Sequence, residues 1–297
     1  MSEHKARGTD LIVNAAYDNT GRMYDFLYVV FGWSSVDGRG VRILTTVHFS
    51  VSFCNAEWDG SHLIFGDGDG KVFKPFTSAF DVSGHELGHA VIQYRAGLGY
   101  YGQNGALNEH LADVIGSMAD QWRLGQTVEQ APWTIGADLF YPGFHGIGLR
   151  SMALPGTAYD DPILGKDPQP ANMRDYVETQ DDNGGVHSNS GILNKGYHDT
   201  AMKIGGNAWE KAGQIWWYAL DLLSPNADFM EFARATVEVA FQRFSRDEQQ
   251  AVVDAWAGVG LSVPPSATAR HFSITHPSPA LRTKKRETNK WRRRPAA

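Results

Sequence analysis

The sequence predicts an α+β protein of two lobes, a β-rich N-terminal lobe and an α-helical C-terminal lobe, with a helix between them that carries two histidines. Two patterns support this division. Apolar and polar residues alternate from Val47 to Phe53, which is typical of a half-buried strand, and glycine-containing turns surround that stretch from residue 14 to about residue 76. After residue 77 the apolar residues recur at three- and four-residue steps, which indicates amphipathic helices.

Three features define the helical part. One predicted helix has an apolar stripe made of Leu107, Leu111, Ile115 and Met118. The segments 208–223 and 228–244 are long and amphipathic. Ser245 and Glu248 form a capping box, in which each side chain accepts a free backbone amide of the other residue, and this predicts a helix that continues to about Trp256.

The composition excludes several classes of protein. Of 297 residues, 42% are hydrophobic and 12% are aromatic, so the chain can bury a sizeable core and is not disordered throughout. The most apolar stretch, residues 26–33, is far shorter than the roughly 18 residues that a membrane-spanning helix needs. Cys54 is the only cysteine, so the chain forms no intrachain disulfide.

Charge is distributed unevenly along the chain. The segment from Pro264 onward carries nine lysines and arginines and one acid, whereas residues 1–263 hold 18 basic and 32 acidic side chains. A basic tail on an acidic body can contact nucleic acid, an anionic membrane or the body itself. It is also typical of a disordered extension without a dedicated partner, which is the interpretation we favour, and we expect no nucleic-acid partner.

These patterns divide the chain into four segments. We expect an N-terminal leader (1–13), a β-rich lobe that includes the histidine-bearing helix (14–100), a helical lobe (101–263) and a basic, disordered tail (264–297). The first twenty residues lack the apolar core and the small-residue cleavage site of a secretory signal.

The strongest chemical signal is the run from His85 to His89, with the sequence HELGH, at the start of the helical pattern. Residues four apart share one face of a helix, so both imidazoles can reach the same ion. Zinc favours such nitrogen ligands, and a catalytic zinc takes three protein ligands and keeps a position for water. Glu86 lies beside that face, where it can take a proton from the water. The alternative is a helix that carries these residues by coincidence.

A second acidic segment, NEHLAD, follows twenty residues after His89. Its Glu109 and Asp113 are four residues apart and therefore share one face of a helix. Such spacing is often no more than a solvated acidic face. The functional interpretation makes Glu109 the third metal ligand and Asp113 an acceptor that fixes the tautomer of one ligand imidazole.

Together these segments resemble the thermolysin family of zinc endopeptidases, whose pattern is HExxH followed by NExxxD. The resemblance covers residues 14–263, and its N-terminal part, which includes AAYDNTGRMYDFLY and TVHFS, is most similar to the shorter, protealysin-like branch. It implies a two-lobed zincin fold with the active-site helix between the lobes. The residues that it places around the metal are the ligands His85, His89 and Glu109, the general base Glu86, and the imidazole partners Asp113 and Asn108.

Further matched segments imply roles in catalysis. Tyr100, eleven residues after His89, matches the tyrosine that stabilises the oxyanion. His187, in the run DNGGVHSNSG, would donate to the same oxyanion and be oriented by Asp182. Arg150, in the run GLRSM, would hold a substrate carbonyl.

The resemblance also implies how substrate binds. Asn55 and Ala56 would lie in an edge strand that pairs with the substrate backbone. The pocket for the residue after the cut would be lined by Phe73, Phe76, Val82, Ile135, Leu139 and Leu149. All six are apolar, so we expect cleavage on the amino side of bulky hydrophobic residues, because an unpaired charge is costly to bury. Glu57, where the family usually has Phe, would favour basic residues near the cut.

The sequence departs from the family pattern at several positions. Asp81 and Asp120 match calcium ligands, but further acids expected near Trp133 are missing, so we expect at most one weak Ca²⁺ site. His110 follows the third ligand where a small residue is usual, and we expect it to be a spectator on the outer face of its helix. Gly88 replaces a common threonine, which predicts a locally softer active-site helix.

Two other functions stay open at this level. One is a catalytically impaired zinc-binding module, against which Glu86 argues, because a structural ion needs no adjacent base. The other is a zinc hydrolase that acts on something other than peptides, against which the edge strand and Arg150 argue. We therefore expect a monomeric zinc metalloendopeptidase that acts on peptides and proteins through a metal-activated water with Glu86 as general base. The resemblance implies secretion, and a cytoplasmic location stays open.

Overall fold

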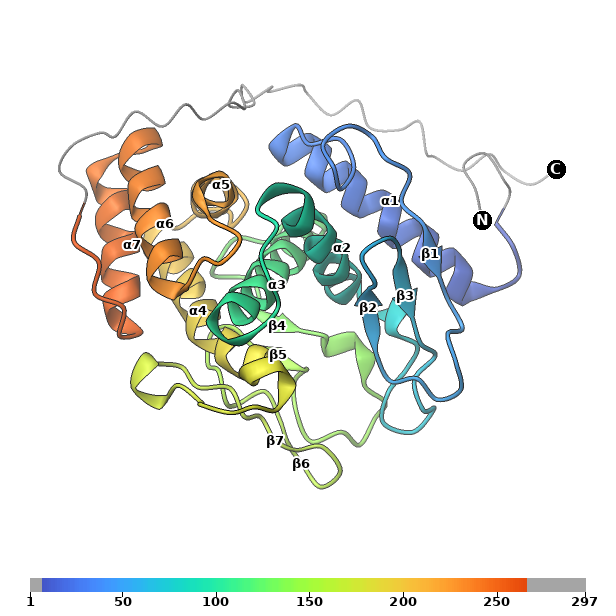
Figure 1. Ribbon diagram of the computed structural model, residues 1–297. Helices are drawn as coiled ribbons and strands as arrows, with labels where there is room; N and C mark the ends of the chain where they lie inside the picture. The colour runs from blue at the N-terminus through green and yellow to red at the C-terminus, as the bar shows by residue number, and fades with distance from the viewer. Residues whose placement is uncertain (1–6, 266–297) are drawn as a thin grey trace.

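The computed structural model describes residues 7–265 of the chain. A long helix, α1 (Leu11–Phe31), lies near the start of this range (Figure 1). Asp10 caps this helix by accepting the backbone N–H groups of Ile12 and Val13, and Gly32 ends it with a left-handed φ of 67°. The prediction of strands and turns from residue 14 onward is therefore wrong here, because the turn signals begin only after Gly32.

The N-terminal lobe holds a small sheet of three short strands, β1 (Thr45–Thr46), β2 (Ala56–Trp58) and β3 (Leu63–Phe65). The strand order is β1-β3-β2, with β1 parallel and β2 antiparallel to β3. Strand β2 is therefore an edge strand. Glu57 is opposite Ile64 in the register.

The predicted strand from Val47 to Phe53 does not form. His48, Ser50 and Ser52 all have positive φ, at 57°, 58° and 51°, and a strand cannot continue through such residues. Val51 is 91% exposed rather than half-buried. The alternation of apolar and polar residues thus belongs to an irregular loop in which every second residue turns the backbone.

Two helices cross the centre of the molecule, α2 (Phe80–Arg95) and α3 (Gly102–Leu124) (Figure 1). Small residues allow their backbones to approach closely. A Cβ atom added at Gly84 would lie 2.9 Å from the Cα atom of Gly116, and one added at Gly88 would lie 3.0 Å from that of Ala112. The close packing of the two helices therefore explains Gly88, while the softer active-site helix stays a prediction.

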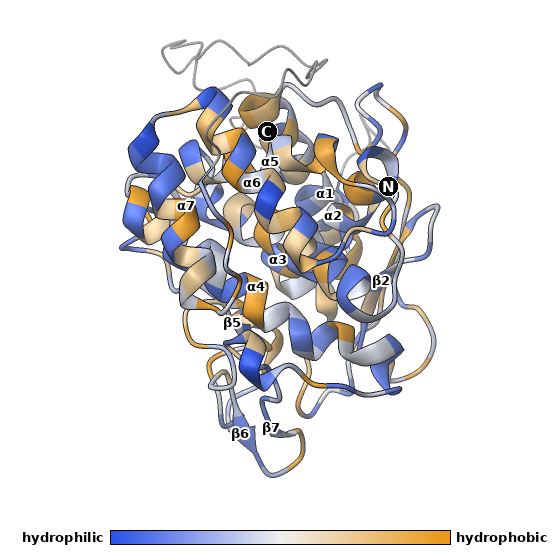
Figure 2. Ribbon diagram, turned by 60° about the vertical axis from the view of Figure 1, so that its left-hand side comes forward, coloured by the Kyte–Doolittle hydropathy of each residue, from blue (hydrophilic) through white to orange (hydrophobic). Residues whose placement is uncertain are grey.

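The helical lobe contains α4 (Asp182–Ile204), α5 (Lys211–Ala219), α6 (Phe229–Arg243) and α7 (Arg246–Gly258). Each carries both hydrophilic and hydrophobic residues (Figure 2). The predicted capping box of Ser245 and Glu248 is present at the start of α7. Trp256 of α7 is fully buried and stacks on Trp216 of α5 with ring centroids 5.5 Å apart.

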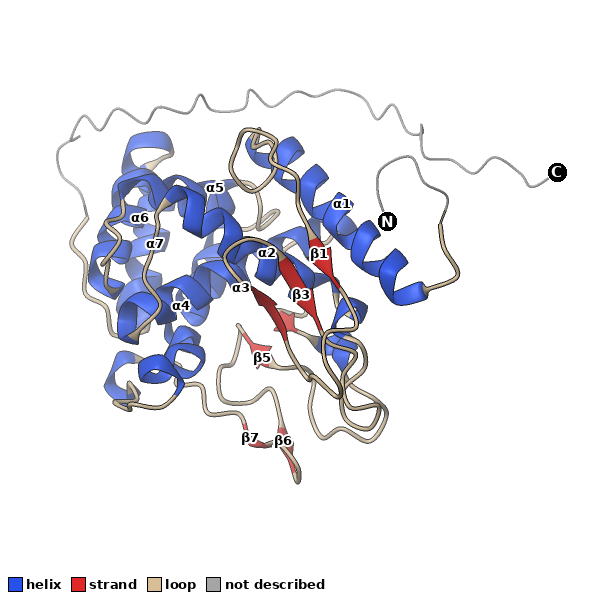
Figure 3. Cartoon of the chain, turned by 45° about the vertical axis from the view of Figure 1, so that its right-hand side comes forward, coloured by secondary structure: helices blue, strands red, loops and turns tan. Residues whose placement is uncertain are grey.

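The chain between α3 and α4 forms short two-stranded pairs. Strand β4 (Thr134–Ile135) is antiparallel to β5 (Arg150–Ser151), and β6 (Asp160–Asp161) is antiparallel to β7 (Gly165–Lys166). In Figure 3 the strands lie in the centre and at the bottom of the view, apart from α6 and α7 at the left. The predicted division into a sheet-containing N-terminal part and a helical C-terminal part is confirmed, with far less strand than expected.

The segment boundaries can be compared with the structure in part. Helix α1 begins at Leu11, so the last residues of the predicted leader already belong to its first turn. The predicted disordered tail lies outside the described residues except for Pro264 and Pro265. Within residues 7–265, no helix has the length and apolar character that a membrane crossing requires.

Candidate active site

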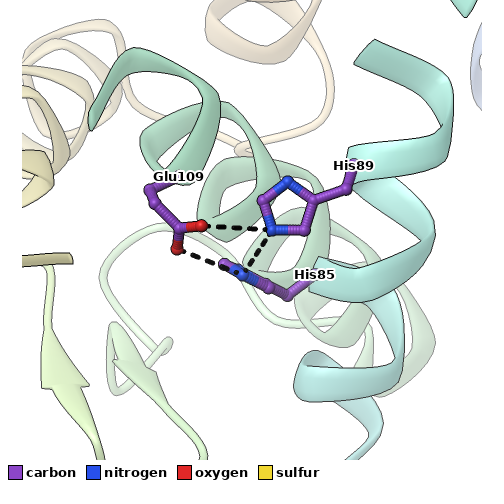
Figure 4. A group of neighbouring side chains, drawn as sticks. All are labelled: His85, His89 and Glu109. Carbon is purple, nitrogen blue, oxygen red and sulfur yellow. Dashed lines mark hydrogen bonds and ion pairs between the residues drawn. The ribbon is translucent and has the colours of Figure 1, made fainter. Parts of the chain in front are cut away.

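Three side chains from α2 and α3 converge at the centre of the molecule (Figure 4). His85 and His89 lie one turn apart on α2, and Glu109 faces them from α3. The two Nε2 atoms are 3.0 Å apart, and the carboxylate oxygens of Glu109 lie 3.4 Å from that of His85 and 3.3 Å from that of His89. All three potential ligand atoms lie within 4.8 Å of one another.

The other ring nitrogen of each histidine has a hydrogen-bond acceptor on α3. His85 Nδ1 lies 2.8 Å from Asp113 Oδ1, and His89 Nδ1 lies 2.9 Å from Asn108 Oδ1. When Nδ1 donates its proton to such an acceptor, the Nε2 lone pair is free to bind a metal. The structure thus brings together all five residues that the sequence placed around the metal as ligands and their partners.

The site favours a bound cation. Burial acts to lower the pKa of His85, but the carboxylates of Glu109 and Asp113 outweigh it and raise that pKa to about 10. Glu109 Oε2 is buried and has no hydrogen-bond partner among the described residues. Two imidazoles and a carboxylate are a common ligand set of catalytic zinc, so these residues fit that ion.

Glu86 follows His85 on α2 and lines the cleft beside the metal ligands. It is 7% exposed, and its carboxylate makes no hydrogen bond or ion pair with the described residues. Burial raises its pKa above the usual value for a glutamate. A raised pKa makes a carboxylate a stronger proton acceptor, as a general base requires.

Two further polar groups reach the same point from other elements. The hydroxyl of Tyr100, in the loop between α2 and α3, donates to Glu109 Oε1. His187 Nε2, on α4, lies 3.5 Å from the Tyr100 hydroxyl and 3.4 Å from Glu109 Oε2. Both groups therefore face the cleft within reach of the metal ligands.

The start of α4 holds His187 in place through an unusual backbone. Asp182, Asn183, Gly184 and Gly185 all have positive φ, at 52°, 49°, 83° and 76°. Such conformations are unfavourable for residues other than glycine and often occur at functional sites. This turn brings the Asp182 carboxylate to 2.6 Å from His187 Nδ1 and 2.9 Å from its backbone nitrogen.

Arg150, on β5, faces the cleft and is bound by Asp113. Its Nε lies 2.8 Å from Asp113 Oδ2, and one terminal nitrogen lies 2.6 Å from Oδ1. Asp113 thus holds both Arg150 and the zinc-ligand candidate His85. The two positive partners outweigh burial and lower the pKa of Asp113 well below its usual value.

The cleft in front of these groups has a volume of about 660 Å³. Its rim includes Asn55, Ala56 and Glu57, so the free edge of β2 borders the cleft. Trp58 fixes β2 to α2 through a 2.8 Å hydrogen bond from Nε1 to Gln93 Oε1.

The structure divides the predicted substrate pocket. Phe73, Phe76, Val82 and Leu149 line the cleft. Ile135 and Leu139 are fully buried and do not line the cleft in this structure, which corrects their predicted position. The sequence interpretation did not predict that Cys54, Asp59 and Leu98 line the cleft. The signal that could have found them is their position near residues that match the family pattern.

His110 is not a spectator on the outer face of α3, because its side chain is fully buried. Its Nδ1 lies 2.8 Å from Asn194 Oδ1 of α4, and the indole N–H of Trp216 donates to its Nε2 at 2.8 Å. Burial lowers its pKa to about 4. The sequence interpretation failed here because α3 is covered on several sides and has no outer face at this point.

Each of the two possible calcium ligands is bound by other groups of the protein. Asp120 is paired with Arg123, whose Nε lies 2.9 Å away. Asp81 accepts the backbone N–H groups of Gly136 at 2.7 Å and Val82 at 2.9 Å. Calcium needs six to eight oxygen ligands, and neither carboxylate belongs to a group of three or more potential metal ligands among the described residues.

A helix with an HExxH pair, a glutamate from the following helix and a cleft bordered by an edge strand define a zinc metallopeptidase. The chain belongs to the thermolysin family of metallopeptidases. Residues 3–93 match the family model for the thermolysin metallopeptidase catalytic domain, and residues 96–261 match the model for its alpha-helical domain. The cofactor of this family, zinc, fits the three ligands described above.

Individual relatives agree with this assignment. An extracellular metalloprotease of Pectobacterium carotovorum is 49% identical over 264 residues, which cover 88% of this chain and 76% of the relative. A thermolysin of Alicyclobacillus acidocaldarius is 37% identical over 257 residues, 83% of this chain and 44% of that protein. The solved precursor of protealysin from Serratia proteamaculans superposes with a TM-score of 0.87 at 50% identity, covering 88% of this chain and 82% of that one.

Proposed function

We propose that this metallopeptidase is an endopeptidase that cleaves on the amino side of bulky hydrophobic residues, with Glu86 as its general base. The observation that carries the proposal is the position of Glu86. Its unpaired, buried carboxylate lies beside the two histidines and opens into the same cleft as the edge of β2. A purely structural metal site needs no such neighbour.

Each residue of the site has a separate role in the reaction. When bound, zinc supplies a Lewis acid that polarises a peptide carbonyl and lowers the pKa of water. Glu86 takes the proton of the attacking water and returns it to the leaving amine, a double role that its raised pKa suits.

Two donors complete the site. The Tyr100 hydroxyl and His187 Nε2 face the reacting carbonyl and stabilise the charge that develops on its oxygen, a contribution of about 2.7–4 kcal/mol for each donor. Asp182 orients His187 from the other ring nitrogen. Arg150 donates a hydrogen bond to the carbonyl of a neighbouring peptide group, while Asp113 fixes its guanidinium.

The substrate lies extended along β2. Asn55 and Ala56 offer backbone groups on the free edge of this strand, as in other cases of strand addition. Phe73, Phe76, Val82 and Leu149 form the apolar surface that receives the side chain after the cut. Burial of a leucine or phenylalanine there contributes roughly 1.5–3 kcal/mol.

The related proteins support a location for this activity. Two relatives that share 44–49% identity with this chain are named extracellular proteases. We therefore propose that the enzyme is secreted. We also propose that it acts as a monomer, since the three metal ligands His85, His89 and Glu109 come from one chain. Size-exclusion chromatography of the zinc-loaded protein measures its oligomeric state.

The decisive experiment compares casein hydrolysis by the wild-type protein and the Glu86→Ala variant, with zinc content measured on both. The proposal expects full zinc occupancy in both proteins and activity only in the wild type. Equal activity in both would refute the role of Glu86. A wild-type protein that binds zinc and cleaves nothing would instead favour the catalytically impaired alternative.

The position of cleavage is tested separately by mass-spectrometric mapping of cuts in a denatured protein mixture. Enrichment of leucine and phenylalanine immediately after the cut supports the pocket. Cuts mainly beside charged residues, with no apolar enrichment, would refute it.

A further inference from the structure

A chain of buried hydrogen bonds runs from the core of the helical lobe to the zinc site. It begins at Trp216 on α5, whose Nε1–H donates to His110 Nε2 at 2.8 Å. His110 Nδ1 lies 2.8 Å from Asn194 Oδ1, and Asn194 Nδ2 donates to Asp113 Oδ2 at 2.9 Å. The four side chains are at most 1% exposed, so water does not compete for these bonds.

The direction of this chain is fixed by its first member. An indole nitrogen can only donate, so His110 Nε2 must accept and its proton must be on Nδ1. Asn194 must then accept through Oδ1, which leaves its amide nitrogen to donate to Asp113. The arrangement admits one assignment of protons and one orientation of the Asn194 amide.

At its other end the chain completes the hydrogen bonding of Asp113. This carboxylate receives Asn194 on Oδ2, Arg150 on both oxygens, and His85 Nδ1 on Oδ1 at 2.8 Å. The donor from Asn194 therefore fixes the carboxylate together with Arg150, and the orientation of the carboxylate directs the His85 ring through its Nδ1. His85 is the metal ligand that would lose its orientation if the chain were broken.

We propose that His110 and Asn194 are positioning residues of the zinc centre, which hold Asp113 and, through it, His85 in the orientation that binds the metal. The proposal rests on the assignment of His85 as a zinc ligand. It gives a function to a histidine that neither binds the metal nor faces the cleft.

A simpler role for His110 would be packing alone. Its ring lies edge-on to those of Trp216 and Phe232, with centroids 6.4 and 5.7 Å apart. Loss of packing would lower stability in any substitution, whereas loss of positioning would lower zinc affinity only when the bond to Asn194 is lost. Two substitutions of similar size can separate these effects.

The test compares His110→Asn with His110→Gln. The amide of asparagine can place a donor where Nδ1 lies and keep the bond to Asn194, while the longer glutamine can place an acceptor where Nε2 lies and keep only the bond from Trp216. Zinc dissociation constants are measured by competition with a chelator, and melting temperatures are measured on the metal-free proteins. We expect the constant to rise about tenfold in His110→Gln and to stay within about threefold of the wild type in His110→Asn, with similar losses of melting temperature.

Equal zinc dissociation constants in the two variants would overturn the proposal, and wild-type protein that binds no zinc would instead overturn the ligand assignment. If either variant does not fold, ring-¹⁵N-labelled histidine in the wild-type protein provides the second measurement. The proposal expects the Nδ1–H signal of His110, protected from exchange by its buried bond, to shift when zinc is added. An unchanged signal on zinc loading would refute coupling between His110 and the metal.

Discussion

At the scale of single residues, the site shifts the pKa values of two neighbouring carboxylates in opposite directions. Burial raises the pKa of Glu86, which has no cationic hydrogen-bond partner among the described residues. Glu109 is buried even more completely, but the charges of His187, His89 and His85 outweigh burial and lower its pKa well below the usual value. One carboxylate is therefore suited to exchange protons and the other to stay ionised as a ligand, so environment rather than residue type sets the roles.

The proposed oxyanion donor can be tested by His187→Ala. We expect kcat/KM to fall by roughly 10²–10³ because one hydrogen bond to the developing charge is lost, while zinc stays bound, because His187 is not a ligand. Steady-state kinetics with a short peptide and zinc analysis give both results. A change in kcat/KM below about threefold would remove His187 from the reacting centre.

A second residue-scale prediction concerns specificity. Glu57 borders the cleft on the edge strand, so Glu57→Gln should reduce the preference for substrates with lysine or arginine near the cut by about two- to fivefold at low salt, the size of an exposed ion pair. The difference should shrink as salt is added, because the cleft is open to water. Ratios of kcat/KM for paired basic and neutral peptides measure it.

Glu129→Gln, an exposed acid outside the cleft, serves as the control and should leave the ratio unchanged. The same loss of preference in both variants would mean that overall charge, rather than Glu57, is responsible.

At the scale of elements, local sequence signals predicted the helices that depend on them. The predictions failed where tertiary packing determines the structure. The capping box and the apolar stripe of α3 are local, and α7 and α3 follow from them. The convergence of His85 and Glu109 was predicted from the resemblance to the family pattern, because spacing within one helix does not show which side chains of another helix it meets. The sequence from Val47 to Phe53 has the alternation of a strand but forms a loop, because the alternation of apolar and polar residues does not reveal positive φ. His110 was misplaced because its surroundings come from α4 and α5, which no spacing on α3 reveals.

The close contact between α2 and α3 leads to a prediction about stability. A Cβ atom at Gly116 would lie 2.4 Å from the backbone oxygen of Asp81, so Gly116→Ala should lower the free energy of unfolding by roughly 1–3 kcal/mol through overpacking. Denaturant unfolding of the metal-free protein measures the change.

Gly21, inside α1, is the matched control because no atom lies within 4 Å of the point that an added Cβ would occupy. Gly21→Ala should raise the free energy of unfolding by about 0.5–1 kcal/mol through helix propensity. A stabilising Gly116→Ala substitution would contradict the close contact.

At the scale of the whole molecule, Asp81 should make stability depend on pH. Burial, helped by the negative charge of Asp120, raises its pKa from 3.8 to about 7. The folded protein then binds this proton more tightly than the unfolded chain does. Stability should therefore fall as pH rises from about 4 to 7 and level off above that, by about 1.4 kcal/mol for each unit of pKa difference.

Melting temperatures of the wild type and Asp81→Asn between pH 4 and 8 test this expectation. The wild type should lose more stability over that range than the variant does, and addition of calcium should change neither curve. Parallel curves would contradict the raised pKa, and a calcium-dependent rise of the wild-type curve alone would restore Asp81 as a cation ligand.

The proposed pairing of substrate with the free edge of β2 has a consequence for which proteins this enzyme can cut. A chain that pairs with this edge must offer several consecutive residues in extended form, with their backbone N–H and C=O groups not already engaged. Helices and inner strands of a folded protein do not meet that condition, so cleavage there must wait until the segment opens locally. The rate of attack on a native target then follows how often that segment opens, and not its sequence alone. Stable proteins, including other copies of this enzyme, would be protected by their own folding.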